Sequence, residues 1–145
     1  MQDLPHHYRV SAKATDTGDV VLGSAGLDDL VTAPPAEFGG PGNRWSPETL
    51  LIGAVADCFV LTFRAVAQAS RLEWASLDCD VEGALDRVER STQFTGLTLK
   101  VRLQVPGSVS VEKAERALHK AEANCLITNS LNCEVTLETD VRHDS

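Results

Sequence analysis

The sequence predicts a single α+β domain in which antiparallel sheets pack around one long, buried central helix. The first observation is a helical pattern from Ser46 to Arg71 that is almost uninterrupted and almost entirely apolar. The second is that runs with strand-like alternation lie both before and after this helix. The third is the length: 145 residues without repeats or an internal linker fit one domain, residues 1–145, with a sizeable core.

Short strands and a long loop are expected before the central helix. Tyr8 to Thr15 alternates loosely, and the turn signal Asp-Thr-Gly-Asp at 16–19 separates it from the apolar run Val20-Val21-Leu22. Leu27 to Thr32 is a candidate third strand. The next segment, APPAEFGGPGNRW, carries three prolines and three glycines, so it forms a loop that delivers Arg44 to the start of the helix.

The start of the central helix is well defined. Ser46 is a good N-cap, Pro47 suits the first helical position, and the Glu48 carboxylate favours the positive end of the helix dipole. The run is long enough to raise a membrane span, but Asp57 and Arg64 fall in its middle. We therefore expect a core helix of a soluble protein, with no membrane as partner.

A hairpin, a second helix and a last strand follow. Alternating residues predict strands over Leu72 to Val88 and Phe94 to Val105, joined as an antiparallel hairpin. Ser110 to Asn124 is an amphipathic helix with Ser110 as its N-cap. Cys125 to Leu131 forms a short turn or helical segment, and Cys133 to Val141 alternates as a final strand.

Composition limits the classes of partner and the compartment. The formal net charge of −8 argues against nucleic acid and against an anionic membrane surface. The polar start MQDLPHHYRV is no signal peptide, and the four cysteines lack close-set disulfide or zinc spacing, so a reducing cytoplasm is expected. His6 and His7 are interpreted as incidental, and neither a metal nor a bound cofactor is expected.

The four cysteines differ in their surroundings. Cys79 and Cys133 occupy alternating apolar positions of predicted strands, where a buried structural thiol is ordinary. Cys58 lies mid-helix among apolar neighbours, which on pattern alone also favours a structural role. Cys125 follows a helix end, where backbone polar groups are free and solvent is near. Periodicity therefore leaves the reactive thiol unassigned.

Three segments together resemble the osmotically inducible protein C and organic hydroperoxide resistance superfamily (OsmC/Ohr). The segments are SPETLL at 46–51, AVADCF at 54–59 and CLITNSL at 125–131. In that family the helix opens with Pro-Glu-x-Leu, Cys-Phe follows ten residues after the Glu, and a second cysteine lies in a turn before the last strand. The match covers nearly the whole chain and implies the OsmC-like fold, although Leu126 stands where many relatives have proline.

The resemblance implies a thiol peroxidase that acts on organic hydroperoxides. Cys58 would attack the peroxide, Cys125 would resolve the product as a disulfide, and an external dithiol of the lipoyl type or a small thiol would restore both. A peroxidatic thiolate needs a positive neighbour, which in the family is an arginine held by the equivalent of Glu48. The first hairpin turn here has no arginine, so Arg44 is the candidate, with a plain surface charge as the alternative.

The resemblance also implies an intertwined homodimer, and helix geometry agrees. Glu48 and Cys58 are ten residues apart, roughly 15 Å along the axis, so one helix cannot bring both side chains to one point. Either the arginine bridges this gap or a second copy supplies Glu48, and we expect a dimer. Asp57 either raises the pKa of the neighbouring thiol or faces a partner.

An apolar substrate pocket is expected from residues such as Phe38, Trp45, Phe59 and Phe63, while each of these aromatics taken singly is better explained as a core residue. Two other functions stay open. One is a non-enzymatic protein of the same fold that holds a small apolar ligand, and the other is a redox sensor that signals through a Cys58–Cys125 disulfide.

Overall fold

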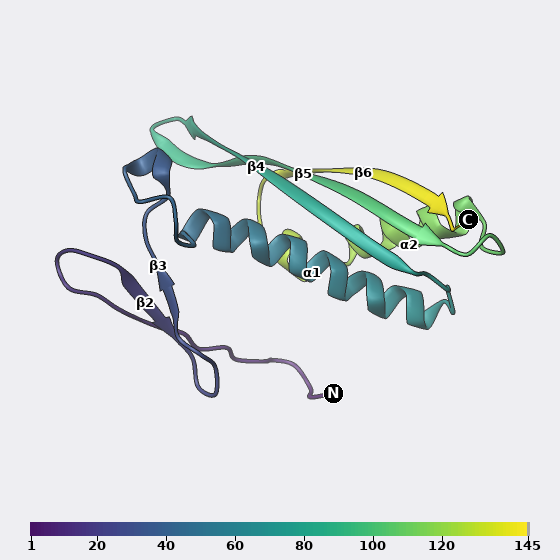
Figure 1. Ribbon diagram of the computed structural model, residues 1–145, viewed down its shortest axis with the longest axis horizontal. Helices are drawn as coiled ribbons and strands as arrows, with labels where there is room; N and C mark the ends of the chain where they lie inside the picture. The colour runs from purple at the N-terminus through teal and green to yellow at the C-terminus, as the bar shows by residue number, and fades with distance from the viewer. Residues whose placement is uncertain (145) are drawn as a thin grey trace. The chain divides into compact units, whose positions relative to one another are not determined.

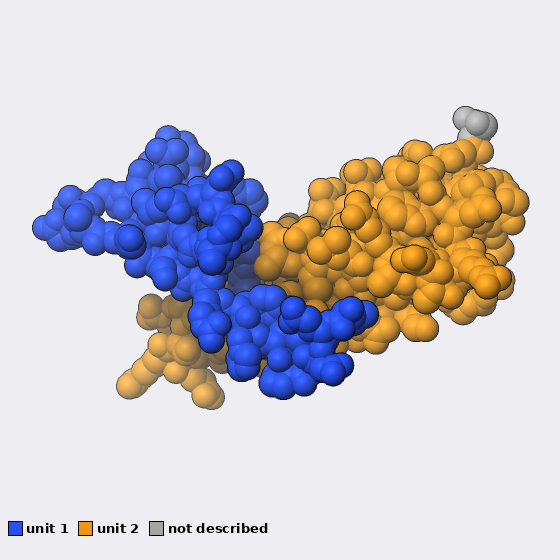
Figure 2. All heavy atoms as spheres, turned by 90° about the horizontal axis from the view of Figure 1, so that it is seen from below, with its two compact units in different colours: residues 1–51 blue, residues 52–145 orange. Residues whose placement is uncertain are grey.

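The computed structural model describes residues 1–144 and confirms the α+β fold class. In chain order the elements are β1 (Ser11–Lys13), β2 (Val20–Gly23), β3 (Leu30–Thr32), the 3₁₀ helix η1 (Ala36–Phe38), α1 (Pro47–Ala69), β4 (Ser76–Val88), β5 (Ser91–Val105), α2 (Val111–Ala123), α3 (Leu126–Asn129) and β6 (Glu134–His143) (Figure 1). The chain divides into two compact units, Met1–Leu51 and the residues from Ile52 onward, with the boundary inside α1 (Figure 2).

The first unit is a small antiparallel sheet of order β1-β2-β3 with a loop fastened to it. The predicted turn between β1 and β2 is present, and Gly18 takes a positive φ of 88° there, which glycine adopts without strain. The long loop returns to β3, since the Ala33 amide donates to the Trp45 carbonyl at 3.0 Å. This contact fixes where α1 begins.

Ser46 caps α1 as its sequence predicts. The Thr49 amide donates to Ser46 Oγ at 3.1 Å, and the Ser46 amide donates to Thr49 Oγ1 at 2.8 Å. The two residues thus satisfy each other's free backbone donors in the manner of a capping box, with threonine in the place of the usual glutamate.

The second unit is built on a three-stranded sheet of order β4-β5-β6. β4 and β5 form the expected antiparallel hairpin, and its turn uses positive φ at Glu89 (47°) and Arg90 (73°). β6 pairs with β5 in parallel, so the expectation of purely antiparallel sheets is wrong for this pair. The reason is the connection: the chain crosses from β5 to β6 through α2, and such a crossover returns the strand in the same direction.

The core lies on one face of this sheet, under α1 and α2. Its buried side chains come from α1, from the segment after it, from β5 and from α2: Val55, Phe59, Phe63, Ala67, Leu72, Leu97, Leu99, Val101, Leu103, Val105, Ala114, Ala117, Leu118 and Ala121.

α1 uses a single stripe of residues for this packing. The expectation of a mostly buried helix is therefore wrong for the chain taken by itself. Only Val55, Phe59, Phe63 and Ala67 are buried, and they recur every four residues. α1 is long and apolar enough to cross a membrane, a test that the core helix of a soluble protein also passes. In the second unit α1 packs on the sheet through this buried stripe, and it carries Asp57 and Arg64 in its middle.

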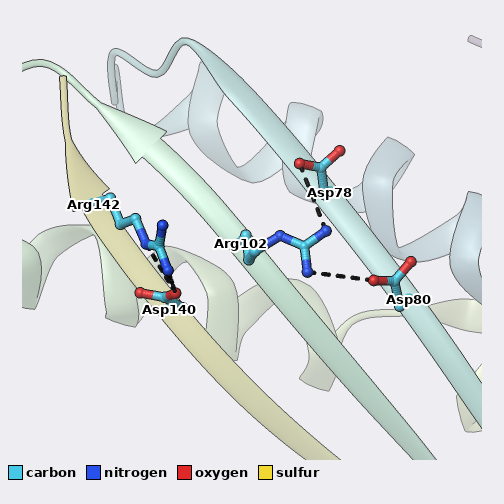
Figure 3. Close-up of polar contacts among 5 residues, drawn as sticks. All are labelled: Asp78, Asp80, Arg102, Asp140 and Arg142. Atoms are coloured by element: carbon cyan, nitrogen blue, oxygen red, sulfur yellow. Dashed lines mark hydrogen bonds and ion pairs between the residues drawn. The ribbon is translucent and has the colours of Figure 1, made fainter.

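The outer face of the β4-β5-β6 sheet is charged. Arg102 on β5 lies 3.4 Å from Asp80 and 4.0 Å from Asp78 on β4, and Arg142 pairs with Asp140 at 2.8 Å within β6 (Figure 3). Within the described residues β4 is an edge strand, and its register shifts between Ala84 and Leu85. All these pairs are exposed, so they contribute little to stability.

Candidate active site

Cys58 and Cys125, the two cysteines predicted to react, lie together in the second unit. Cys58 is on α1, Cys125 directly precedes α3, and each thiol is near enough to influence the ionisation of the other. Both are free. Each of the two thiols affects the pKa of the other, so the second unit places this predicted pair close together.

The prediction that Cys125 lies near solvent is wrong, because its side chain is fully buried. Cys125 is the N-cap residue of α3, and the short helix turns it inward. The turn is held by two side chains: Thr128 Oγ1 donates to the Cys125 carbonyl at 3.1 Å, and Asn129 Nδ2 donates to the Ala123 carbonyl at 3.1 Å. Cys125 follows the end of α2 but is buried, because α3 begins directly after it.

The pKa of Cys58 is lowered from its usual range. Partial burial of the thiol raises it, but hydrogen bonds from the Ile127 amide, the Cys125 thiol, the Thr62 hydroxyl and the Leu126 amide together outweigh burial. The Thr62 Oγ1 atom lies 3.7 Å from the Cys58 sulfur, one turn further along α1. Donors aimed at a sulfur favour its thiolate form, which is the nucleophilic form.

The pKa of Cys125 moves in the opposite direction. Burial is the largest cause of the increase, and the neighbouring Cys58 thiolate adds to it, while hydrogen bonds from Thr128 oppose it. The two thiols therefore differ in acidity: the pKa shift favours the thiolate at Cys58 and the protonated form at Cys125.

Sequence reasoning missed Thr62 and the amides of Leu126 and Ile127. A hydroxyl four residues after a cysteine in an otherwise apolar helix was a signal for Thr62, because residues i and i+4 share a helix face. The α3 amides had no comparable signal, since amides are present at every position and only the fold aims them.

Cys79 and Cys133 have the structural character predicted for them. Both are partly buried and pack against the hydrophobic core. The pKa of Cys79 is raised to about 11, chiefly by burial and then by the charges of Asp80 and Cys125, so this thiol stays protonated. Within residues 1–144, no group of three or more His, Cys, Asp or Glu side chains is arranged to hold a metal ion.

Arg44 and Glu48 belong to the first unit and do not pair in this chain. Arg44 Nη2 lies 3.5 Å from Asp19 Oδ2, and both side chains are more than two-fifths exposed, at 44% and 41%. Asp19 is part of the hairpin turn in which the resemblance would have placed an arginine. Glu48 Oε1 is buried and finds no hydrogen-bond partner in the described part of the chain. The expected Arg44–Glu48 pair is therefore absent from the described residues. A buried carboxylate oxygen normally accepts a hydrogen bond, and Glu48 Oε1 accepts none there.

The predicted aromatic pocket is wrong for two of its members. Phe59 and Phe63 are fully buried in the core, where no substrate reaches them. Trp45 is 51% exposed, and Phe38 lines a cavity of about 580 Å³ within the first unit. The cavity walls are mainly apolar, and Glu48 is the one acidic residue among them.

Comparison with known proteins agrees with this architecture. The family model described as OsmC-like protein matches residues 40–140. The chain is 27% identical to the uncharacterized protein YmaD of Bacillus subtilis, covering 94% of this chain and 95% of that one. It is 28% identical to an organic hydroperoxide resistance protein of Xanthomonas axonopodis pv. citri, covering 92% and 96%.

Two further matches extend the comparison. Peroxiredoxin OsmC of Escherichia coli is 27% identical, with 67% of each chain covered. The solved structure of an OsmC-like protein of unknown function from Vibrio cholerae superposes with a TM-score of 0.81 at 20% identity, covering 95% of this chain and 100% of that one, and this match concerns the fold. The sequence motifs, the arrangement of strands around α1 and the family match lead to one conclusion: the chain belongs to the OsmC-like family.

Proposed function

We propose that this protein is a thiol-dependent peroxidase that reduces organic hydroperoxides. The observation that carries the proposal is the opposite pKa shift of two adjacent thiols, lowered at Cys58 and raised at Cys125. This difference assigns attack to Cys58 and resolution to Cys125. The names of two relatives, a peroxiredoxin and an organic hydroperoxide resistance protein, support the same chemistry.

The reaction proceeds in three balanced steps. The Cys58 thiolate attacks one peroxide oxygen, the O–O bond breaks, and the departing alkoxide takes a proton to become an alcohol, leaving Cys58 as a sulfenic acid. The Cys125 sulfur then attacks the Cys58 sulfur, which forms the disulfide and releases water. An external dithiol, of the lipoyl type or a small thiol, reduces this disulfide by exchange and is itself oxidised.

The proposal includes a homodimer in which the sites are completed by both copies. Leu61 on α1 is 51% exposed, and Glu48 Oε1 has no hydrogen-bond partner among residues 1–144. Glu48 and Cys58 are ten residues apart on α1, roughly 15 Å along its axis. We therefore expect Glu48 of one copy to serve the thiol site of the other, with Arg44 as the arginine it holds there. A reducing cytoplasm remains the expected location.

A non-enzymatic ligand-binding protein is the second candidate, because two observations favour it. Arg44 is already paired with Asp19, and the first unit contains a cavity of about 580 Å³ with mainly apolar walls. In this case the cavity would hold a small apolar ligand, and the cysteines would have no turnover.

A peroxidase assay separates the two candidates. The fully reduced protein is mixed with cumene hydroperoxide and dihydrolipoamide, and consumption of both is followed alongside Cys58→Ser and the matched control Cys133→Ser. Turnover by the wild type and by Cys133→Ser, with loss in Cys58→Ser, supports the peroxidase. Absence of wild-type turnover with either a lipoyl-type dithiol or a small thiol would reject it and favour ligand binding.

A further inference from the structure

The small sheet of the first unit has one polar face. Side chains alternate between the two faces of a strand, so Ser11 and Lys13 of β1 lie on the same face, together with Gly23 of β2, which pairs with Ser11. Ala12 and Leu22 lie on the opposite face and line the apolar cavity of this unit. The polar face is therefore a separate surface from that cavity.

The polar face contains a hollow of about 400 Å³. Two small residues, Ser11 and Gly23, line it and are paired with each other across β1 and β2. Three longer, charged side chains line it as well: Arg9, Lys13 and Asp29. Because the small residues lie between the long ones, the face is concave rather than flat. The volume falls in the range of pockets that hold small molecules in proteins.

The three charged side chains of the hollow have no counter-ion in the described part of the chain. Arg9, Lys13 and Asp29 take part in none of the ion pairs formed among residues 1–144. The backbone beside them is nevertheless held in place, since Ser24 Oγ donates to the Arg9 carbonyl at 2.8 Å. This bond ties the residues before β1 to the end of β2. The charges are thus positioned by the sheet and available to a ligand.

The Asp29 carboxylate lies over the centre of the hollow. Leu22 of β2 pairs with Leu30 of β3, so Asp29, the residue before Leu30, adjoins Gly23. A Cβ atom added at Gly23 would lie 3.1 Å from Asp29 Oδ1. Glycine inside a strand often marks a place where another group approaches closely, and here that group is a carboxylate. The negative charge is therefore roughly one strand spacing, about 5 Å, from Ser11, which lies between Arg9 and Lys13.

We propose that this hollow binds an acidic α-amino acid, with the ammonium group of the ligand on Asp29 and its two carboxylates on Arg9 and Lys13. The guanidinium fork of Arg9 suits a carboxylate, and the Lys13 ammonium serves as a compact positive charge. These two residues are four apart on one strand, roughly 14 Å between Cα atoms, so each takes its own carboxylate. The hydroxyls of Ser11 and Ser24 also line the hollow and can donate to the carboxylates.

The arrangement of charges selects this class of ligand over its neighbours. Two positive groups and one negative group line the hollow, and an acidic amino acid carries the complementary two negative groups and one positive group. A dicarboxylate without an ammonium group would place a like charge against Asp29. A neutral amino acid would leave Arg9 or Lys13 without a carboxylate. This binding site goes beyond the peroxidase proposal and does not depend on it.

Heteronuclear NMR titration of the full chain with L-glutamate, at constant ionic strength, tests the proposal. The charges are exposed, so we expect a Kd of about 1 mM, with the largest shifts at the amides of Ser11, Gly23 and Ser24. L-glutamine lacks one carboxylate and glutarate lacks the ammonium group. Each should therefore bind about 10-fold more weakly than L-glutamate.

Variants assign the contacts. Arg9→Gln and Lys13→Gln should each weaken L-glutamate binding by about 10-fold, and Lys120→Gln, a change on α2, should not alter it. Asp29→Asn should weaken L-glutamate but strengthen glutarate, because it removes both the partner of the ammonium group and the like charge. The same spectra show whether each variant is folded, and the ligand series on the wild type decides the matter if one is not. Absence of saturable binding up to about 10 mM, equal affinity for the three ligands, or shifts confined to amides outside the hollow would overturn the proposal.

Discussion

The Cys58 sulfur lies 3.7 Å from the hydroxyl oxygen of Thr62, one helical turn away on the same helix. This hydroxyl is one of four groups that lower the pKa of Cys58. The other three belong to α3 or to Cys125, so Thr62 is the one residue of the four that can be replaced without altering α3 or the second thiol. A side chain can thus adjust the reactivity of the thiol independently of the resolving turn.

Thr62→Val should shift the pH midpoint of Cys58 alkylation upward and slow the reaction at neutral pH by about 10-fold, because a hydrogen bond to a charged group is lost while the volume is kept. Iodoacetamide labelling across a pH series measures both effects. Thr62→Ser is the matched control and should keep the wild-type curve. Identical curves for valine and threonine would remove Thr62 from the site.

Cys125→Ser should still react once with peroxide but should stop at the Cys58 sulfenic acid. Without the resolving thiol this species persists, so overoxidation of Cys58 to sulfinic acid should rise with peroxide dose. Intact-protein mass spectrometry distinguishes the added oxygens from the loss of two hydrogens that marks the wild-type disulfide. A Cys125→Ser protein that oxidises no further than the wild type would contradict the assignment of Cys125.

Arg44→Ala tests whether this arginine takes part in the reaction. If Glu48 of a second copy holds Arg44 at the thiol site, its loss should lower kcat/KM for hydroperoxide by about 100- to 1000-fold, the usual effect of removing a donor aimed at developing charge. Its pair with Asp19 is exposed and worth only about 0.2–1 kcal/mol, so it does not prevent such a move. Arg116→Ala is the control, and an unchanged rate in Arg44→Ala would make Arg44 a surface charge.

The raised pKa of Cys79 predicts a loss of stability in alkali. The folded protein holds this proton more tightly than the unfolded chain does, so its contribution is complete below about pH 9.0 and disappears as the pH rises toward about 11. Urea denaturation between pH 8 and pH 11 should show a steeper decline for the wild type than for Cys79→Ala. If the free energy of unfolding fell equally with pH in the two proteins, ionisation of Cys79 would have no effect on stability, and the prediction would be wrong.

Local signals were sufficient for most elements. Ser110 caps α2 as predicted, since the Lys113 amide donates to its hydroxyl at 3.1 Å. The turn at 16–19 and the hairpin between β4 and β5 also form where turn residues and alternation place them. These features depend on contacts within a few residues, which a sequence shows directly.

The direction of β6 and the exposure of α1 depend on contacts across the chain. Alternation from Cys133 to Val141 identifies a strand but not its direction, which is set by the crossover through α2. Apolar composition predicts that α1 is covered but does not say by what, and in one chain only the stripe that includes Val55 and Phe59 is covered. The helix between the two strands was the available sign of the parallel pairing.

The site was also predicted only in part: the residues that carry local motifs were identified, and the groups that the fold brings to them were not. Cys58 and Cys125 were found through motifs, and the structure brings them together. The groups that lower the pKa of Cys58 were not found, because backbone amides of α3 leave no mark in the sequence. Arg44 was chosen as the arginine nearest the helix, and its observed partner, Asp19, is distant in sequence and close only through the loop and hairpin.

The acidic side chains along β4 disfavour edge-to-edge pairing of this strand between two copies of the protein. Within the described residues β4, a strand of 13 residues, has a free edge, and a free edge is a template on which another chain can build a continuous sheet, the first step of aggregation. If two β4 edges approached each other, Asp78, Asp80 and Glu82 of both would be drawn into rows of like charge, and the irregularity at Ala84 and Leu85 would interrupt the match. The β4 edge therefore resists fibril-like growth while the protein is crowded with copies of itself.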